Sequence, residues 1–316
     1  MTPQGFLNFG HRGLSSERAP VDVRACRVIA SVSGGKDSAA ASLLLRDHGI
    51  DHDRVFMDTG WEHPLTYEYL RGELTHALGP IQEIRGQYDF LELVRRKGLF
   101  PSRVMRFCTT ELKVFPIRAY IREIIDADGV DVVNVVGIRR AESRARSQMP
   151  EWEWSESFDC WVWRPLVDWH RADVDAIHQA HALRVNPLYG MGATRVGCWP
   201  CIHARKEEIA LVAKVDPSRI ELIDTTEIDL NERGAERDVE LGRPPAVRSM
   251  FSYHGGDSKH FALPIRHAVD WARSSRGEWQ PEGDDGCARF GLCSALPEDD
   301  AAAPAPMPLF EGQRVG

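Results

Sequence analysis

A hexapeptide near the N-terminus combines the residue types that bind phosphate. Ser33-Gly34-Gly35-Lys36-Asp37-Ser38 follows a short β-branched run and precedes a helix-forming run. Glycines let backbone N–H groups approach phosphate oxygens, the helix N-terminus adds partial positive charge, and the hydroxyls and the lysine donate further. A Gly-Gly pair alone would indicate only a tight turn capped by the two serines. The full hexapeptide predicts a nucleotide site, and it is not the Walker pattern.

Strands and helices alternate around this loop. The predicted strands are residues 27–33, 55–58, 81–84 and 130–137, and the predicted helices are residues 37–49, 63–79, 90–97, 112–125 and 174–182. The alternation predicts an α/β fold, a doubly wound and mostly parallel sheet covered by helices on both faces. Ligands of such sheets bind at the carboxyl ends of the strands. Because the loop 33–38, Asp58-Thr59-Gly60 and Gly137-Ile138-Arg139 all follow predicted strands, we expect them to share one site.

The composition changes along the chain and predicts four segments. Residues 1–26 form a lead-in, and residues 27–205 carry the nucleotide-binding domain. Residues 206–295 read as a smaller, helical and irregular C-terminal region that contains cysteines and completes a metal site. Residues 296–316 are a low-complexity acidic, proline- and alanine-rich tail, which we expect to be disordered.

The bulk properties limit the class of protein. The chain has 316 residues, 43% of them hydrophobic, and a formal net charge of −8. This charge argues against a protein that coats nucleic acid nonspecifically, since such a protein needs a broad basic surface. The sequence shows no apolar run of about 18 residues and no apolar signal core over residues 1–20. We therefore expect a cytoplasmic protein without a membrane partner.

The seven cysteines are expected to be ligands or catalytic thiols rather than disulfide partners. Cys198-Trp199-Pro200-Cys201 has the spacing of metal ligands, and two such thiolates usually need two more. Zinc bound by four thiolates and a reversible disulfide between the two cysteines are both compatible with this spacing. Cys26, which opens the first strand, is most simply a buried apolar residue.

Basic and aromatic residues gather between residues 103 and 169. The basic set is Arg103, Arg106, Lys113, Arg118, Arg139, Arg140, Arg144 and Arg146. Arg139 and Arg144 are the predicted phosphate contacts, because a guanidinium binds phosphate bidentately; about half of the set should be solvated surface charges. Five tryptophans, at positions 152, 154, 161, 163 and 169, either stack on a base or pack a core, and core strands are favoured.

The motifs together resemble a known family. The hexapeptide resembles the PP-loop of the adenine nucleotide alpha hydrolase superfamily, the N-type ATP pyrophosphatases. Six further segments resemble the phosphoadenosine phosphosulfate (PAPS) reductase-like branch: 58–64 (DTGWEHP), 108–113 (CTTELK), 137–143 (GIRRAES), Arg164-Pro165-Leu166 with Trp169, 186–189 (NPLY) and 197–201 (GCWPC). The resemblance covers about residues 27–205 and implies an adenine nucleotide as ligand.

Two departures from the reductases favour ATP as that nucleotide. The reductases usually lack the Lys-Asp pair of the loop, and their substrate has no β,γ-pyrophosphate; this loop retains Lys36 and Asp37. The reductases' Glu-Cys-Gly-(Leu/Ile)-His motif has no match here. Both departures favour an ATP-cleaving relative, similar to the DndC-type sulfur-incorporation proteins of DNA phosphorothioation systems.

The resemblance implies roles for individual residues. Lys36, Asp37 and Arg139 would be catalytic, with Lys36 neutralising the leaving pyrophosphate and Asp37 holding Mg²⁺. The expected nucleotide-binding residues are Ser33, Gly34, Gly35, Lys36, Asp37, Ser38, Asp58, Gly137, Arg139 and Arg144.

The resemblance also implies a [4Fe–4S] cluster. Cys108 matches a cysteine of the reductases, so its ligands would be Cys108, Cys198, Cys201 and Cys287, with Cys293 as the alternative fourth ligand and Cys160 after it. The cluster would be structural, tune charge near the substrate, or deliver sulfur through a persulfide on Cys160, Cys287 or Cys293.

Three functions remain open from the sequence. The first is an ATP pyrophosphatase that adenylylates an acceptor, such as a nucleic acid, for sulfur transfer from a donor protein of the cysteine desulfurase kind. The second is a PAPS or adenosine phosphosulfate (APS) reductase that releases sulfite and uses thioredoxin. The third is a nucleotide-sensing subunit without turnover.

Overall fold

The computed structural model describes residues 19–254 and 260–274, and these residues form two compact units. The first unit comprises residues 19–90 and 106–199, and the second comprises residues 91–105, 200–254 and 260–274. The boundary between Trp199 and Pro200 falls inside the Cys198-Trp199-Pro200-Cys201 segment. The predicted tail 296–316 and both cysteines of the predicted C-terminal ligand set, Cys287 and Cys293, lie outside the described residues.

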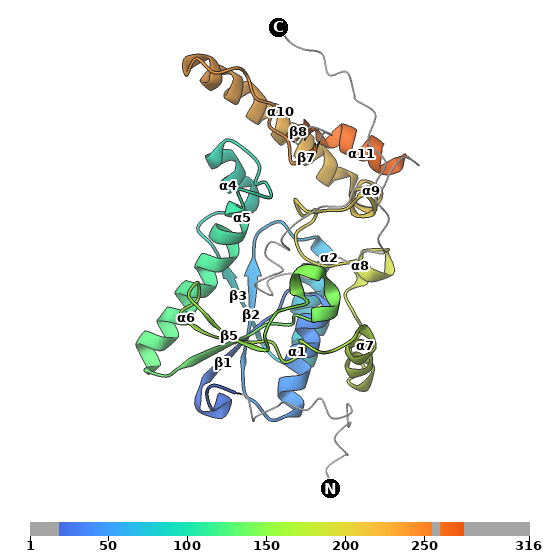
Figure 1. Ribbon diagram of the computed structural model, residues 1–316. Coiled ribbons are helices and arrows are strands. Elements are labelled where there is room, and N and C mark those ends of the chain that lie inside the picture. Colours follow the sequence, from blue (N-terminus) through green and yellow to red (C-terminus); the bar gives the residue numbers. More distant parts are fainter. Residues whose placement is uncertain (1–18, 255–259, 275–316) are drawn as a thin grey trace. The chain divides into compact units, whose positions relative to one another are not determined.

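A six-stranded sheet organises the first unit (Figure 1). Its strands are β1 (Arg27–Ser31), β2 (Asp53–Asp58), β3 (Ile81–Arg85), β4 (Val132–Val135), β5 (Trp152–Ser155) and β6 (Cys160–Trp163). The order across the sheet is β3-β2-β1-β4-β6-β5, and only β5 pairs antiparallel to its neighbour. The predicted α/β fold with a mostly parallel sheet is confirmed.

Helices and helical turns connect the strands of the first unit. The α-helices are α1 (Lys36–Asp47), α2 (Pro64–Tyr69), α3 (Thr75–Leu78), α5 (Phe107–Thr109), α6 (Phe115–Asp128), α7 (Arg171–Ala180) and α8 (Pro187–Gly190). The π-helical turns η3 (Leu70–Leu74) and η4 (Thr110–Val114) join α2 to α3 and α5 to α6. The 3₁₀ turns are η2 (Val23–Ala25), η5 (Arg140–Glu142) and η6 (Arg144–Arg146).

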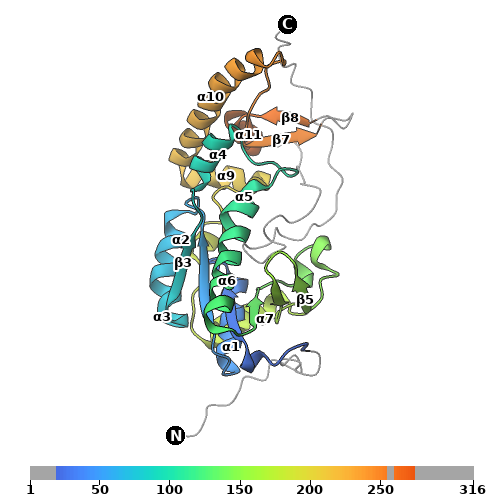
Figure 2. The same ribbon diagram turned by 90° about the vertical axis from the view of Figure 1, so that its left-hand side faces the viewer.

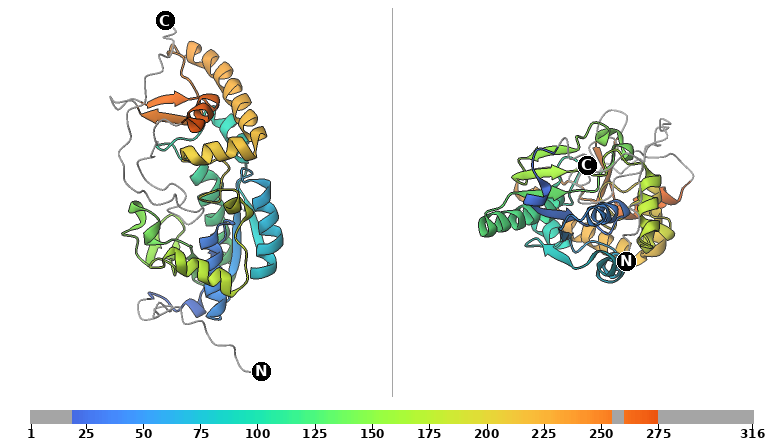
Figure 3. Two further views of the ribbon diagram at one scale, coloured as in Figure 1. Left: turned by 90° about the vertical axis from the view of Figure 1, so that its right-hand side faces the viewer. Right: turned by 90° about the horizontal axis from the view of Figure 1, so that it is seen from below.

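The alternation of side chains along the strands produces two apolar cores, one on each face of the sheet. Val28 and Ala30 of β1 pack in the core that contains α1, η3 and α7. Ile29, the residue between them, packs in the core that contains α6. Figure 1 shows α1 and α6 on opposite sides of the strands. In Figure 2 α6 faces the viewer, and in the left view of Figure 3 α7 lies in front of α1 on the other face. The sheet is therefore covered on both faces.

The strand order reverses between β1 and β4. The chain adds β2 and β3 on one side of β1 and then returns to place β4 on the other side. In sheets of this kind, the crevice at the carboxyl ends of the two strands at the reversal is the usual ligand site. The loops after β1 and β4 begin at this edge of the sheet.

The second unit is mostly helical. Its helices are α4 (Phe90–Lys97), α9 (Lys206–Val215), α10 (Pro217–Glu240) and α11 (Ile265–Arg273), and β7 (Phe251–His254) pairs antiparallel to β8 (His260–Leu263). The buried carboxylate of Glu227 on α10 accepts hydrogen bonds from the backbone N–H groups of Met250 (2.8 Å) and Ile265 (2.9 Å). Glu227 therefore holds α10 to the starts of β7 and α11.

Candidate nucleotide site

The loop after β1 is closed by its own serines. Ser38 Oγ accepts a hydrogen bond from the Ser33 N–H (3.1 Å) and donates one to the Gly35 carbonyl (3.0 Å). Gly34 has φ +75°, and a Cβ on it would lie 3.0 Å from Thr66 Cγ2. Since L side chains rarely adopt this conformation, the position favours glycine. Gly35 caps α1 without a side-chain hydrogen bond, so the first N–H groups of α1 have no side-chain cap to compete with an anion.

Lys36 and Asp37 are neighbours in sequence but differ in their electrostatic partners. Asp37 Oδ1 pairs with Arg139 Nε at 2.6 Å, and both side chains are buried. The Lys36 ammonium lies 5.3 Å from the centroid of the Tyr189 ring, and no carboxylate among the described residues forms an ion pair with it. Burial lowers the pKa of Lys36. An ammonium that is buried but not neutralised is a strong site for an anionic ligand.

Asp37 and Arg139 belong to a buried group of four charges, which we name the charge cluster: Asp37, Arg139, Glu142 and Arg146. The Arg139 N–H donates to Glu142 Oε2 (2.9 Å), and Arg139 Nη2 lies 3.6 Å from Glu142 Oε1. Arg146, with no exposed surface, pairs with the same carboxylate. Burial raises the pKa of Glu142. The cluster has formally equal numbers of positive and negative charges, so its residues mainly compensate one another.

The loop after β4 lies directly against the start of α1. A Cβ added to Gly137 would lie 2.5 Å from the Asp37 carbonyl oxygen and 2.8 Å from the Ser38 nitrogen. Only glycine permits this approach without movement of the backbone. The structure therefore brings the predicted residues Ser33 to Ser38, Gly137 and Arg139 together at the carboxyl ends of β1 and β4.

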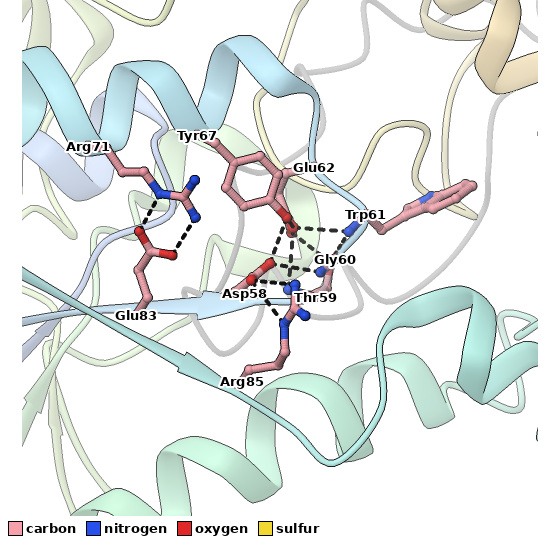
Figure 4. A network of polar contacts seen from close by, with 9 residues as sticks. All are labelled: Asp58, Thr59, Gly60, Trp61, Glu62, Tyr67, Arg71, Glu83 and Arg85. Carbon is pink, nitrogen blue, oxygen red and sulfur yellow. Dashed lines mark hydrogen bonds and ion pairs between the residues drawn. The ribbon is translucent and has the colours of Figure 1, made fainter.

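Asp58, at the end of β2, organises the next loop (Figure 4). Its carboxylate accepts hydrogen bonds from the Gly60 N–H (2.8 Å) and Tyr67 Oη (2.6 Å), and it pairs with Arg85 (2.8 Å). Tyr67 Oη also lies 2.9 Å from Glu62 Oε2, and burial raises the pKa of the Tyr67 phenol. These partners account for Asp58 as an organiser of residues 59–62; its contact with a nucleotide stays a prediction.

The predicted arginine contacts differ in their surroundings. Arg144 lies exposed in η6. Arg140 pairs with Asp168 and donates to the Met149 carbonyl (2.8 Å). Of the arginines after β4, Arg144 is thus the exposed one, while Arg139 and Arg146 compensate buried carboxylates. Contact of Arg139 and Arg144 with phosphate stays a prediction.

The tryptophans pack mainly with one another. Trp152 and Trp163 stack across β5 and β6 with ring centroids 5.0 Å apart, and Trp154 and Trp161 meet edge to face. Trp169 is buried in the core beside α1 and α7. This arrangement fits the expected core strands, although Trp154 itself is exposed.

The predicted cluster ligands are distributed over both units. Cys108, in α5, is half-buried, and Cys198 forms an isolated backbone bridge with Glu62. Cys201 is buried, and its sulfur accepts a weak hydrogen bond from the His203 N–H (3.5 Å). Over residues 19–254 and 260–274, no group of three His, Cys, Asp or Glu side chains is arranged to hold a metal ion. The described cysteines thus do not form a metal site by themselves, and the cluster stays a prediction that depends on Cys287 or Cys293.

Cys160 lies at the amino end of its strand, whereas the predicted nucleotide site lies at the carboxyl ends of β1 and β4. It begins β6, which runs parallel to β4. Burial raises the pKa of its thiol to about 12. This environment disfavours Cys160 as a metal ligand or persulfide carrier, because both roles need the thiolate.

Comparison with known proteins identifies the family. The phosphoadenosine phosphosulfate reductase domain model matches residues 27–204. The chain belongs to this family. The predictions of a PAPS reductase-like domain and of a PP-loop enzyme of this kind are confirmed. A more specific likeness to the DndC-type proteins has no support from the comparisons.

Individual relatives of this PAPS reductase-domain protein cover different parts of it. The "Uncharacterized 37.8 kDa protein in gpa 5'region" of Escherichia phage 186 is 34% identical over 242 residues, 61% of this chain and 72% of the relative. The adenosine 5'-phosphosulfate reductase of Burkholderia cepacia is 40% identical over 70 residues, 22% of this chain and 28% of that enzyme.

One solved structure that is similar to this chain is the phosphoadenylyl-sulfate (PAPS) reductase of Candida auris in its phosphate complex. The two sequences are 22% identical, the TM-score is 0.43, and the match covers 55% of this chain and 81% of that one. Among the described residues of the present protein, no helix has the length and hydropathy that a membrane span requires.

The sequence did not identify some residues of the site. Tyr189, within a segment recognised only by resemblance, places its ring beside the Lys36 ammonium. Glu142, which the sequence indicates only as part of the segment 137–143, joins two arginines of the charge cluster. The four-residue spacing between Glu142 and Arg146 is the one signal in the sequence that could have indicated their pairing.

Proposed function

We propose that the protein binds ATP with Mg²⁺ at the loop 33–38 and transfers AMP to an acceptor with release of pyrophosphate. The proposal rests mainly on the difference between Lys36 and Asp37, the two charged residues of the loop. Asp37 is paired with Arg139, whereas the buried Lys36 ammonium has no carboxylate partner among the described residues. The β- and γ-phosphates of ATP would supply the missing negative charge, and AMP lacks both of these groups.

The proposed reaction needs charge stabilisation and positioning more than covalent chemistry. A nucleophilic oxygen or nitrogen of the acceptor bonds to the α-phosphorus, and the bond from that phosphorus to the pyrophosphate oxygen breaks. The electron pair leaves with the pyrophosphate, and the acceptor's proton passes to solvent. Lys36 and the N–H groups at the start of α1 stabilise the leaving charge.

A magnesium ion fits the oxygen donors near the loop. Asp37 Oδ1 is engaged by Arg139, and no hydrogen bond to Oδ2 is formed by the described residues, so Oδ2 is available to a hard cation. Mg²⁺ bound there would offset phosphate charge.

We propose nucleic acid as the acceptor class and a cysteine desulfurase-type protein as the sulfur donor, as the family resemblance suggests. The predicted [4Fe–4S] cluster, held by Cys108, Cys198, Cys201 and Cys287 or Cys293, is part of this proposal. Adenylyl transfer itself uses none of these thiolates. Anaerobic purification with iron and sulfide analysis tests the cluster; zinc without iron would replace it, and a metal-free protein would reject both.

The identity of the products distinguishes the candidate functions. The full chain is incubated with Mg²⁺, double-stranded DNA or RNA, and either ATP or a sulfonucleotide. Pyrophosphate from ATP supports the proposal. Sulfite from APS or PAPS with thioredoxin would instead establish the reductase alternative, which the partial likeness to APS reductases favours. Lys36→Ala should lose pyrophosphate release, while Lys214→Ala, at an exposed position of α9, should retain it.

A further inference from the structure

His178 of α7 lies buried against the first turn of α1. Its Nε2 lies 2.8 Å from the carbonyl oxygen of Lys36, and its Nδ1 lies 3.2 Å from the carbonyl oxygen of Leu183. The residue is 3% exposed. A carbonyl oxygen only accepts hydrogen bonds, so the shorter contact, to Lys36, requires a proton on Nε2; a neutral imidazole in this tautomer donates no hydrogen bond to Leu183. The imidazole thereby connects the backbone of Lys36 to α7.

The same segment contacts the loop at two further points. The Tyr189 ring lies beside the Lys36 ammonium, 5.3 Å from ring centroid to nitrogen. The Asn186 side chain donates to Thr66 Oγ1 (3.3 Å), and its nitrogen would lie 3.7 Å from a Cβ on Gly34. Residues 178–189 therefore lie beside Gly34, and they contact Lys36 at its backbone and at its ammonium.

We propose that His178 is a positioning residue that fixes Lys36 for the recognition of a nucleoside triphosphate. Lysine has a flexible four-carbon stem, so its ammonium is placed accurately only if its backbone is held. His178 supplies that support from outside the loop and does not touch the nucleotide. The inference rests on the proposed role of Lys36 in binding the β- and γ-phosphates.

Two substitutions separate the bond to Lys36 from the rest of the imidazole. Gln places an amide nitrogen near the position of Nε2, whereas Asn reaches only the position of Nδ1. We expect His178→Asn to weaken ATP binding about tenfold and AMP binding less than about twofold, while His178→Gln keeps the ATP affinity within about threefold of wild type. His181→Asn, at the end of the same helix and partly exposed, is the matched control and should bind ATP as wild type does.

Binding is measured on the full chain by titration with ATP and with AMP, together with the melting temperature without nucleotide. Wild-type ATP affinity in a folded His178→Asn variant would overturn the proposal. Equal losses for ATP and AMP would overturn it too, because a merely structural role predicts no preference for the triphosphate.

A measurement on the wild-type protein covers the case in which His178→Asn does not fold. The ¹⁵N chemical shifts of the His178 ring should show a protonated Nε2, and an unprotonated Nε2 would contradict the bond to Lys36.

Failure of the proposed function can be distinguished from failure of this inference. If Lys36→Ala binds ATP as tightly as wild type, Lys36 does not recognise the triphosphate. If Lys36→Ala loses ATP but His178→Asn does not, only the inference about His178 fails.

Discussion

Arg139 and Asp37 form a buried ion pair, with Nε 2.6 Å from Oδ1, that joins the loop after β4 to the first turn of α1. The two residues are 102 positions apart in the sequence. The pair lies where the strand order of the sheet reverses, and it leaves the adjacent Lys36 as the loop charge without a carboxylate partner among the described residues.

Removal of one member of this pair should strongly destabilise the protein. Asp37→Ala leaves the buried Arg139 with less compensation, so we expect a loss of about 3–5 kcal/mol in the free energy of unfolding. The matched control is Asp175→Ala, which breaks the exposed pair with Arg171 on α7 and should cost about 0.3–0.5 kcal/mol. Urea denaturation measures both. Similar losses in the two variants would mean that the buried pair has no special structural role.

The close approach of the loop after β4 predicts a steric effect at Gly137. Gly137→Ala places a methyl group within 2.5 Å of the Asp37 carbonyl oxygen, so the loop must shift. We expect weaker ATP binding and a lower melting temperature. Gly72→Ala, a helical position where an added Cβ meets no atom within 4 Å, should be neutral or stabilising by up to about 1 kcal/mol. If both alanine variants behave alike, the contact with α1 is not tight.

The free energy of unfolding of the second unit should fall as the pH rises, because of the carboxyl group of Glu227. Burial raises the pKa of its carboxyl group to about 7. The folded state therefore holds the proton more tightly than the unfolded chain, and the stability that this proton provides is lost as the pH rises towards and through 7. Between pH 5 and pH 8, Glu227 should lower the free energy of unfolding by about 2–3 kcal/mol.

The comparison with Glu227→Gln isolates this contribution. The side chain of glutamine does not titrate, but its single oxygen replaces only one of the two carboxylate oxygens, Oε1 and Oε2, that accept from the N–H groups of Met250 and Ile265. The variant is therefore compared with itself at the two pH values, because its stability at any one pH should be lower for this separate reason. Unfolding of the wild type and of the variant is measured at pH 5 and pH 8. An unchanged pH dependence in the variant would assign the effect to another group.

The thiol of Cys160 should resist alkylation in the folded protein. It is 2% exposed and its pKa is raised to about 12, so thiolate is scarce at neutral pH. Iodoacetamide at pH 8 followed by peptide mass analysis should modify Cys160 only after denaturation. Rapid labelling of the native protein would restore Cys160 as a candidate persulfide carrier.

The sequence predicted much of the fold because local patterns determine these elements. The apolar runs at residues 27–33 and 55–58 correspond to β1 and β2, and the helix-forming run at 37–49 corresponds to α1. The tryptophan-rich β5 and β6 were less clear, since alternating aromatic residues also suit a stacking surface. The predicted fold class is confirmed because alternating strands and helices have few ways to pack.

The partners of the site residues could not be predicted, because they depend on long-range packing. The loop motif identified Lys36, Asp37 and Arg139 but not that the last two pair with each other. His178 had no visible partner in the sequence, and it meets Lys36 only because α7 packs against α1. Chemical type and spacing therefore indicated which residues gather at the site, and the tertiary structure determined which charges compensate one another.

The most direct measurement is the affinity of the wild type and of Lys36→Ala for ATP and for AMP, with Mg²⁺ present. The account predicts that Lys36→Ala weakens ATP binding by about 10- to 100-fold and changes AMP binding by less than about twofold, since the ammonium acts on the β- and γ-phosphates. An equal effect on both nucleotides, or no effect on ATP, would contradict the claim that Lys36 recognises the triphosphate.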